Sequence, residues 1–479
     1  MQLSAIGSRL SAARLARRGR ARFVVGLAAV AAMTAAACKE ITVPNLNNPS
    51  LEQLTDNPTV GRVNTAVVGM LINLRGRIGT EASAMGILGK ESYNLDQAEP
   101  RNVLGYLQGP IEPGGFVQDL SWTAGYRNLL QGAVILQATD KVVDYTAAQK
   151  EGIRGFVKTI MAMELLTQIR IRDVAGIMVD INADPSAPLG AIVPKDQALT
   201  RIAALLDEAK THLQAAGATF AFPLHAGFAG FNTPATFIQF NRGLKARVEV
   251  YRQQWTSALT ALGESFIDVS SGSAATLAKG VYHVFSTSSG DALNTLYDPT
   301  PATLYVHPSI LNGAQLRANG EPDLRLSSKT APGTIRVVQQ VQGTHRFTIY
   351  SSNTAPVPML RNEELILLRA EARYQAGDVT GALADINFIR VNSGGLAPLA
   401  GFADLNAFVD ELLYNRTYSL LFEGGHRWVD YRRYGRLGQL PKINTAINEK
   451  TFPYVMFPQD ECNQRSPQPQ PGCSAVVGQ

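Results

Sequence analysis

The sequence of 479 residues predicts a mostly α-helical fold, in which paired helices support a loop-rich region that contains a few short strands. Long segments with helical periodicity alternate with irregular stretches, and one helical pair recurs later in the chain. Residues 267–358 are instead rich in Ser, Thr, Gly, Asn and Pro. The hydrophobic fraction of 45% is ample for a large core and excludes a globally disordered chain.

The first 37 residues are typical of an export signal. They contain six arginines, all before Phe23, and no lysine or acidic residue. An apolar run follows from Phe23 to Ala37, and it is shorter than the ~20 residues that span a bilayer. Removing these six from the 44 basic residues leaves 38 against 39 acidic residues. The formal charge of +5 therefore lies in the leader, and we expect no nucleic-acid partner for the folded body.

Small residues stand immediately before the first cysteine, in Ala35-Ala36-Ala37-Cys38. This arrangement resembles the lipobox of bacterial lipoproteins, in which the cysteine thiol is acylated. We therefore predict that Cys38 carries the lipid and that residues 38–58, rich in Asn and Pro from residue 45 onward, form the anchor and an extended tether. The alternative is ordinary signal cleavage, with Cys38 an incidental thiol.

The other two cysteines, Cys462 and Cys473, flank a loop rich in Pro and Gln near the end of the chain. In the oxidising compartment that the leader implies, such an even pair favours a disulfide. The alternative is two free thiols on a frayed tail.

Helical periodicity marks nine segments between residue 118 and residue 434. They are Gln118–Val143, Ala147–Ile171, Asp196–Ala216, Pro234–Gln254, Trp255–Phe266, Arg361–Ala376, Val379–Asn392, Leu405–Gly424 and Arg427–Tyr434. Residues 80–117 and 267–358 are expected to be irregular, the second block with short strands inserted into the helical protein.

An internal repeat links two of the helical pairs. The segment that contains Ala246 and Ala258 aligns with the segment that contains Ala370 and Ala382, each a helix, a tight turn and a second helix that opens with Ala-Leu. Small alanines at a helix crossing allow a close approach, as in tetratricopeptide-like pairs. The alternative is two unrelated helical hairpins.

The C-terminal part of the sequence resembles the SusD/RagB family of bacterial lipoproteins. The matching motifs are Arg361–Ala372 followed by Gly377-Asp378, the block from Glu411 to Gly435, Phe457-Pro458 with Glu461, and, upstream, Trp122 with Tyr126 at a helix start. The resemblance is specific over residues 359–461 and vague over 45–117 and 267–358. One departure is the double glycine Gly424-Gly425, where commoner members have one.

The resemblance implies a lipid-anchored protein of the outer membrane, facing the cell exterior, that captures glycan or peptide nutrients. Family members cap a SusC-like TonB-dependent transporter and deliver nutrients to it. The implied fold has four tetratricopeptide-like pairs and a loop-rich ligand face. We expect a signal peptide over 1–37, the anchor and tether over 38–58, and one SusD-like domain over 59–479. Its scaffold would span about 118–266 and 359–436, and its insertion about 267–358.

Four charged residues near the C-terminus, Arg416, Glu423, Arg427 and Asp430, allow two interpretations. They could bind an anionic substrate. We favour hydrogen-bonded ion pairs that join the last helices to the scaffold, because arginine suits partly buried pairs with carboxylates.

The sequence carries no catalytic signature, so an enzyme is not predicted. Its six histidines form no His-x-x-x-His pair, and no Gly-x-Ser-x-Gly motif occurs. Neither a metal nor a cofactor is expected, and a hydrolase has no supporting set of residues.

Sugar-binding proteins commonly use exposed aromatic rings together with Asn, Asp and Arg. All three tryptophans have positions that the scaffold explains, so a ligand platform must come from Tyr or Phe in the irregular stretches. The candidates are Tyr93, Asn94 and Asp96 in one stretch and Tyr297 and Tyr305 in the other. These residues could instead fill loop cores. A different class of function is a repeat-type interaction protein that has no small ligand.

Overall fold

The structure is a computed structural model that describes residues 51–479. The predicted signal peptide, the predicted lipid site at Cys38 and the first part of the predicted tether lie outside these residues. Residues 51–479 belong to one compact unit.

The helices of the first half are these: α2 (Leu51–Thr55), α3 (Val60–Arg75), α4 (Ile78–Leu88), α5 (Arg101–Val103) continued by the π-helix η1 (Leu104–Gln108), α6 (Trp122–Lys141), α7 (Ala147–Arg172), α8 (Lys195–Gln214), α9 (Pro234–Tyr251) and α10 (Trp255–Gly263). Those of the second half are α11 (Ala274–Ala278), α12 (Pro308–Asn312), α13 (Leu324–Lys329), α14 (Asn362–Gln375), α15 (Val379–Asn392), α16 (Leu405–Ser419), α17 (His426–Arg433) and α18 (Gln459–Asn463).

The strands are short except for one hairpin: β1 (Ser92–Asn94), β2 (Ile177–Met178), β3 (Ile192–Val193), β4 (Gly280–His283), β5 (Leu304–Val306), β6 (Thr330–Val338), β7 (Val341–Phe347) and β8 (Val357–Arg361). Four 3₁₀ turns complete the described elements: η2 (Asp173–Ala175), η3 (Ala226–Phe228), η4 (Leu437–Gln439) and η5 (Thr445–Ile447).

The predicted mostly α-helical fold is confirmed, because helices α6 to α10 and α14 to α17 overlap the nine predicted segments. Helix α16 ends at Ser419 and does not continue to Gly424. The reason lies in the backbone that follows, where Phe422, Gly424 and Gly425 all have positive φ angles that a right-handed helix excludes.

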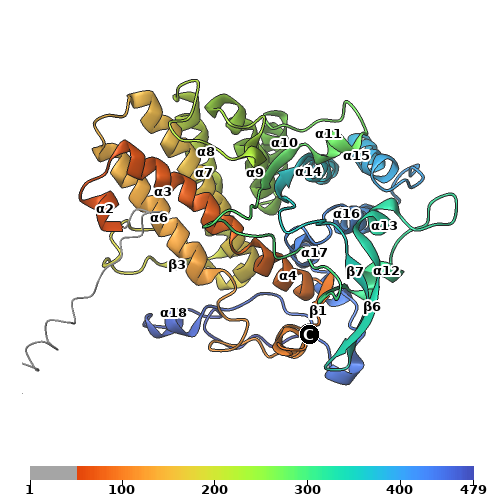
Figure 1. Cartoon of the computed structure of the whole chain (residues 1–479). Coiled ribbons are helices and arrows are strands. Elements are labelled where there is room, and N and C mark those ends of the chain that lie inside the picture. Colours follow the sequence, from red (N-terminus) through yellow and green to blue (C-terminus); the bar gives the residue numbers. More distant parts are fainter. Residues whose placement is uncertain (1–50) are drawn as a thin grey trace, which may run out of the picture. The chain divides into compact units, whose positions relative to one another are not determined.

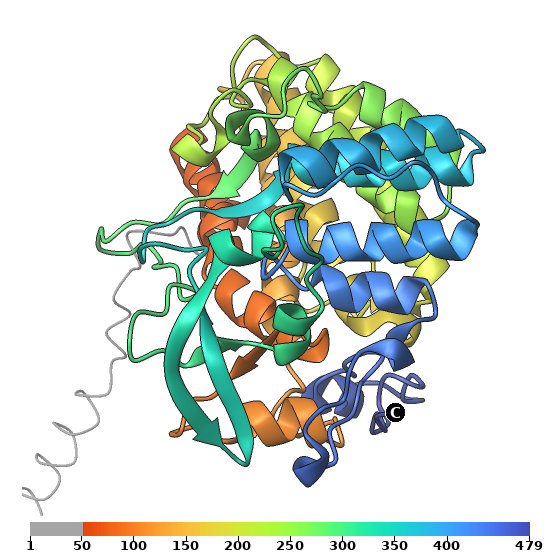
Figure 2. The same ribbon diagram turned by 90° about the vertical axis from the view of Figure 1, so that its right-hand side faces the viewer.

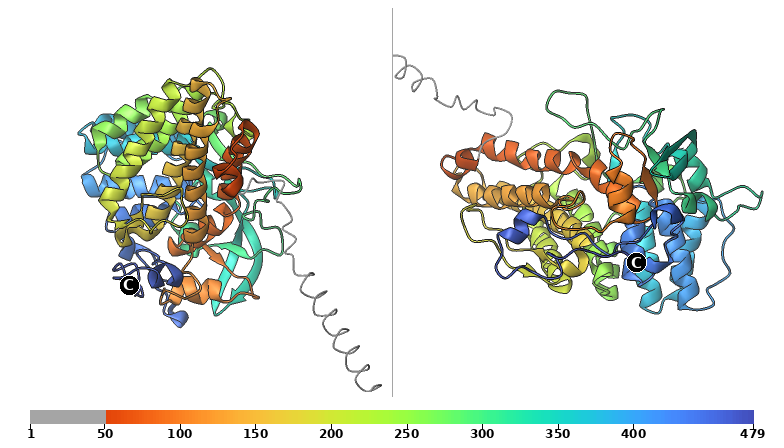
Figure 3. Two further views of the ribbon diagram at one scale, coloured as in Figure 1. Left: turned by 90° about the vertical axis from the view of Figure 1, so that its left-hand side faces the viewer. Right: turned by 90° about the horizontal axis from the view of Figure 1, so that it is seen from below.

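The helices pack as sequential pairs. Helix α7 packs against α8, α9 against α10 and α14 against α15, while α3 lies beside α6 (Figures 1 and 3). The pairs α9–α10 and α14–α15 are the two copies of the predicted repeat, and Ala246, Ala258, Ala370 and Ala382 are all fully buried. These small side chains let α10 and α9 also contact α14.

Two expectations for the N-terminal part were wrong. Residues 51–55, expected in an extended tether, form helix α2, and the side chain of Leu54 is buried. Helix α4 occupies the start of the stretch 80–117, which was expected to be irregular, and helix α3 precedes it. Helix α4 is buried on several faces, so its apolar residues do not form the single stripe that sequence periodicity detects. In α3 the buried Val63, Val67, Met70 and Leu74 do follow helical spacing, and the sequence analysis overlooked them.

The insertion between α10 and α14 contains more regular structure than the sequence predicted. Its strands β5, β6 and β7 join β1 in an antiparallel sheet of order β1-β5-β7-β6. Figure 2 shows the long β6–β7 hairpin curving beside the helices of the N-terminal part. A small hydrophobic core fixes this sheet to the scaffold, with Phe347 of β7 stacked on Phe422 at 4.0 Å between ring centroids.

Candidate functional site

The antiparallel pairing of β1 and β5 brings together the two stretches that the sequence indicated for ligand binding. In the register of this pair, Tyr93 lies opposite Tyr305 and Asn94 lies opposite Leu304. Residues more than 200 positions apart in the sequence therefore share one small region of the structure.

Tyr93 and Tyr305 themselves cannot stack on a ligand, because each is only 1% exposed. The hydroxyl of Tyr93 accepts a hydrogen bond from the Asn444 side chain at 2.7 Å, and the hydroxyl of Tyr305 donates to the Thr334 carbonyl at 2.6 Å. Burial raises the pKa of both tyrosines. Tyr93 and Tyr305 therefore fill the loop core, as the alternative interpretation of the sequence had it.

The other three candidates lie in different surroundings. Asn94 borders a cavity, which is described next. Asp96 accepts a hydrogen bond from the Ala98 backbone at 2.9 Å and stabilises the turn after β1. Tyr297 is half-buried and packs against the small hydrophobic core of the insertion.

A cavity of about 290 Å³ lies between α4, the α5–η1 segment and the loop that precedes β5. We call it the polar cavity, and it is lined by Gly79, Thr80, Ser83, Ala84, Asn94, Asn102, Tyr106, Thr295, Asp298, Thr303 and Leu304. Its volume is at the lower end of the ~300–1,000 Å³ typical of small-molecule sites.

Local structure explains how these residues converge. Thr80 and Ser83 are three positions apart on α4 and so share one helix face. Gly79 allows close approach of the loop, because a Cβ atom at this position would clash with the Thr295 side chain. Asp298 fixes the loop from the other side, since its carboxylate accepts hydrogen bonds from the backbone of Thr303 at 2.6 Å and Leu304 at 2.5 Å.

The polar groups of this cavity are largely unused by the protein. Within residues 51–479, the side chains of Thr80, Ser83, Asn102 and Tyr106 have no hydrogen-bond partner. Asn94 accepts one hydrogen bond through its side-chain oxygen, and its amide group remains free to donate. The cavity therefore presents hydroxyl and amide groups that can both donate and accept.

An exposed aromatic ring stands next to the polar cavity. Phe116 is 40% exposed, and its ring lies edge-on to the ring of Tyr106 at 5.9 Å between centroids. The Arg101 guanidinium covers part of Phe116 at 4.7 Å from the ring centroid. The sequence analysis missed Phe116 and Tyr106, although both lie in the irregular stretch in which a platform was expected.

A larger cavity of about 620 Å³ lies elsewhere, between α6, α7, α8 and the loop from residue 179 to residue 190. Its helical walls are mostly aliphatic, with Leu136, Met161, Leu165 and Leu205. We call it the scaffold cavity. Lys158, Arg201, Asp180 and Asn182 also line it, so this cavity combines aliphatic helical walls with charged and amide groups.

The C-terminal charged residues have structural partners rather than a shared site. Arg416 and Asp430 form an ion pair at 2.6 Å, and each is only 1% exposed. Glu423 instead pairs with Arg361 at 2.8 Å. Arg427 donates to the Lys90 carbonyl and makes no ion pair within residues 51–479.

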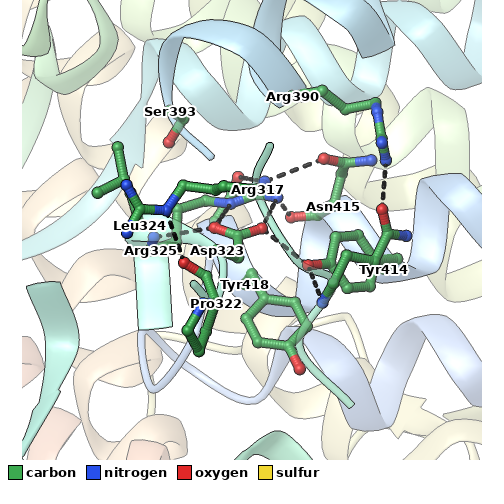
Figure 4. Close-up of polar contacts among 12 residues, drawn as sticks. Arg317, Pro322, Asp323, Leu324, Arg325, Arg390, Ser393, Tyr414, Asn415 and Tyr418 are labelled. Atoms are coloured by element: carbon green, nitrogen blue, oxygen red, sulfur yellow. Dashed lines mark hydrogen bonds and ion pairs between the residues drawn. The ribbon is translucent and has the colours of Figure 1, made fainter. Parts of the chain in front are cut away.

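A second buried network ties the insertion to helix α16 (Figure 4). Arg325 of α13 donates to the carboxylate of Asp323 at 2.5 Å and to the Asn415 side chain at 3.0 Å. The hydroxyl of Tyr414 donates to the same aspartate at 2.8 Å. These contacts position the insertion, and hence β5 and the loop before it, against the helical scaffold.

The comparison with known proteins agrees with the sequence motifs. The family model described as the SusD family matches residues 311–468. The chain is 32% identical over 139 residues to the SusD-like protein P38 of Formosa agariphila. Over these residues the chain is similar to the SusD family. The aligned segment is 27% of this chain and 27% of that relative, so the chain spans about a quarter of the length of the curated relative it matches.

Solved structures share the fold. A SusD superfamily protein from Bacteroides vulgatus has a TM-score of 0.62 at 14% identity, over 85% of this chain and 97% of that one. NanU of B. fragilis has a TM-score of 0.60 at 13% identity, over 90% and 100%. A SusD-like carbohydrate binding protein from B. vulgatus has a TM-score of 0.59 at 15% identity, over 79% and 84%. At these identities the likeness concerns the fold.

The polar cavity lies outside the segment that the SusD family model matches. Near the C-terminus, Cys462 and Cys473 form a disulfide that closes the loop between them. In the part of the chain that is described, no helix has the length and apolar character to cross a membrane. No group of His, Cys, Asp and Glu within residues 51–479 is arranged to hold a metal ion.

Proposed function

We propose that this SusD-like protein takes part in nutrient uptake by binding carbohydrate in the polar cavity, with Phe116 as the adjacent stacking surface. The observation that carries the proposal is the set of free hydroxyl and amide groups on Thr80, Ser83, Asn102 and Tyr106. A saccharide offers hydroxyls that can satisfy such groups, and its apolar ring face suits an exposed aromatic ring. A structural neighbour named as a carbohydrate binding protein supports this ligand class.

In this proposal the protein binds its ligand and does not transform it chemically. It is exported by residues 1–37, attached by lipid at Cys38 to the outer membrane, and faces the cell exterior. It passes its ligand to a SusC-like TonB-dependent transporter. The sequence motifs of the family and the lipobox-like Ala35–Cys38 support this assignment.

The test is a ligand screen with the purified chain lacking residues 1–37. We expect it to retain oligosaccharides on a glycan array and to leave them unhydrolysed after prolonged incubation. Calorimetry with the tightest ligand then compares three variants. Tyr106→Phe removes one hydroxyl and Phe116→Ala removes the ring, and each should weaken binding by about tenfold. The control Leu316→Ala alters an exposed apolar side chain outside the cavity and should leave affinity unchanged.

Two results would contradict the proposal. Retention of peptides without any glycan would reassign the ligand class. Turnover of a bound glycan that a point substitution abolishes would show an enzyme.

A second candidate is the repeat-type interaction protein, and the scaffold cavity favours it. Aliphatic side chains from α6, α7 and α8 line this cavity beside Lys158, Arg201 and Asp180, which suits an amphipathic segment of another protein. A failed screen across broad glycan and peptide libraries, with a transporter still co-purifying, would favour this candidate.

A further inference from the structure

One charged residue contributes to the lining of the polar cavity. Thr80, Ser83, Asn94, Asn102, Tyr106, Thr295 and Thr303 supply its uncharged polar groups, whereas Asp298 supplies a carboxylate. Among residues 51–479, no lysine, arginine or histidine lines it. The charge that a ligand meets in this cavity is therefore negative.

The carboxylate of Asp298 is held in place by the backbone, not by a cation. Its Oδ2 atom accepts the Thr303 and Leu304 N–H groups, at 2.6 and 2.5 Å. Within residues 51–479, Asp298 forms no ion pair, and its Oδ1 atom has no hydrogen-bond partner. This oxygen remains available to accept a hydrogen bond from a ligand hydroxyl.

Two arginines of this region are engaged elsewhere. Arg101 stacks on Phe116 and pairs with Glu99 at 2.5 Å. Arg336 of β6 donates to the Ala302 carbonyl at 2.6 Å. Neither lines the cavity, so a ligand carboxylate, sulfate or phosphate held inside it would face Asp298 without a cation there to compensate. Arg101 lies outside the cavity, on Phe116, and shares its charge with Glu99.

We infer that the polar cavity selects uncharged saccharides and rejects acidic ones, with Asp298 as the residue that sets this preference. The inference rests on the proposed carbohydrate function and names its substrate class. A carboxylate accepts hydrogen bonds from neutral hydroxyls but repels a like charge held at contact distance. Acidic glycans, including uronates and sulfated or sialylated chains, are therefore excluded.

The test uses three matched forms of the neutral oligosaccharide that binds most tightly on an array of neutral, uronate-containing, sulfated and sialylated glycans. Oxidising its primary hydroxyls to carboxylates gives the acidic form, and methyl esterification of that product gives an uncharged form of similar size. We expect the acidic form to bind at least ~10-fold more weakly than the parent, and the ester to recover most of the affinity. Salt should strengthen binding of the acidic form alone, because it screens the repulsion.

The Asp298→Asn variant identifies the residue responsible. Asparagine keeps an oxygen for the Thr303 and Leu304 N–H groups and removes the charge. The ratio of acidic-form to parent affinity should rise ~10-fold or more in this variant. The control Asp96→Asn makes the same change on the turn after β1, outside the cavity lining, and should leave the ratio unchanged.

The outcomes separate the two proposals. If the native chain binds no glycan, the carbohydrate function fails and this inference fails with it. If the parent binds and the acidic form binds equally well, or if the ester is as weak as the acid, carbohydrate binding stands and selection by charge is overturned. The salt series on the native chain decides the question even if Asp298→Asn does not fold.

Discussion

Buried charged side chains of this protein each depend on a particular partner. The sequence motif predicted that Arg416 and Asp430 take part in ion pairs, and the structure shows that they pair with each other between α16 and α17. It could not predict the partner of Glu423, because Arg361 is 62 positions away and meets it only through tertiary packing. Sequence reasoning therefore identified charged residues of this motif without assigning their partners, and it wrongly included Arg427 among the ion-paired residues.

Breaking the Arg416–Asp430 pair should destabilise the protein strongly. In Asp430→Asn the Arg416 guanidinium loses its charged partner while fully buried, and we expect a loss of about 3–5 kcal/mol in the free energy of unfolding. Chemical denaturation at pH 7 measures it. The matched control is Asp410→Asn, because the Asp410 side chain is 70% exposed in its ion pair with Arg436, and its loss should be at most ~1 kcal/mol. Equal losses in the two variants would contradict this account.

Buried histidines should make the protein less stable in mild acid. Burial, together with neighbouring cationic groups, lowers the pKa of His283 to about 3, and burial lowers that of His307 to about 4. The unfolded chain binds protons at these positions below about pH 6.5, and the folded chain does not. Stability is therefore lost as the pH falls from about 6.5 towards 4.

The variant His283→Gln tests this dependence. Its unfolding free energy should fall less steeply than that of the native chain, by roughly 1.4 kcal/mol per pH unit between pH 6 and pH 4. Urea titrations at a series of pH values measure both slopes. Parallel pH profiles for the two proteins would show that His283 does not titrate as this account requires.

At the scale of elements, periodicity identified the paired helices of the scaffold and overlooked α3 and α4 near the N-terminus. Helices α7, α8, α14 and α15 were predicted within a few residues of their observed bounds. The N-terminal helix α3 was missed, because its buried Val63, Val67, Met70 and Leu71 stand among Gly and β-branched residues. The β1–β5 pairing was also hidden, since pairing of short strands far apart in the sequence leaves no local pattern.

Close packing of α7 on α8 depends on a glycine. A Cβ atom at Gly155 would lie 2.9 Å from the Ala209 carbonyl oxygen and close to the Leu213 side chain. We therefore expect Gly155→Ala to lower the melting temperature, with a cost of about 1–3 kcal/mol from overpacking. Gly263 at the end of α10 has open space around its Cα, so Gly263→Ala should be neutral or stabilising by up to ~1 kcal/mol. Stabilisation by both substitutions would show that helix propensity outweighs packing at Gly155.

For the whole molecule, lipid attachment at Cys38 is a proposal that can be tested separately from ligand binding. Cys38→Ala tests the attachment in cells. We expect the variant to leave the membrane fraction and appear in a soluble fraction, because the thiol that would carry the acyl chains is gone. Fractionation followed by immunoblotting measures this, with Cys462→Ser/Cys473→Ser as a control that retains Cys38. Membrane retention of Cys38→Ala would contradict acylation at this residue.

The proposed ligand face could be predicted only in outline. The sequence placed it in the irregular stretches, and Asn94 does line the polar cavity. The sequence prediction named Tyr93 and Tyr305, but strand pairing buries both of them. It did not name Tyr106 and Phe116, which the η1 segment and the loop after it bring to the cavity. Exposure of an aromatic ring is a property of the folded surface, so composition alone could not decide between these residues.

The most direct measurement of the central claim is a crystal structure of the chain with the tightest-binding oligosaccharide from the glycan array. We predict electron density for a sugar ring in the polar cavity, with hydrogen bonds to Thr80, Asn102 and Tyr106 and a ring face against Phe116. Density for the sugar in the scaffold cavity, with the polar cavity filled only by water, would contradict the account.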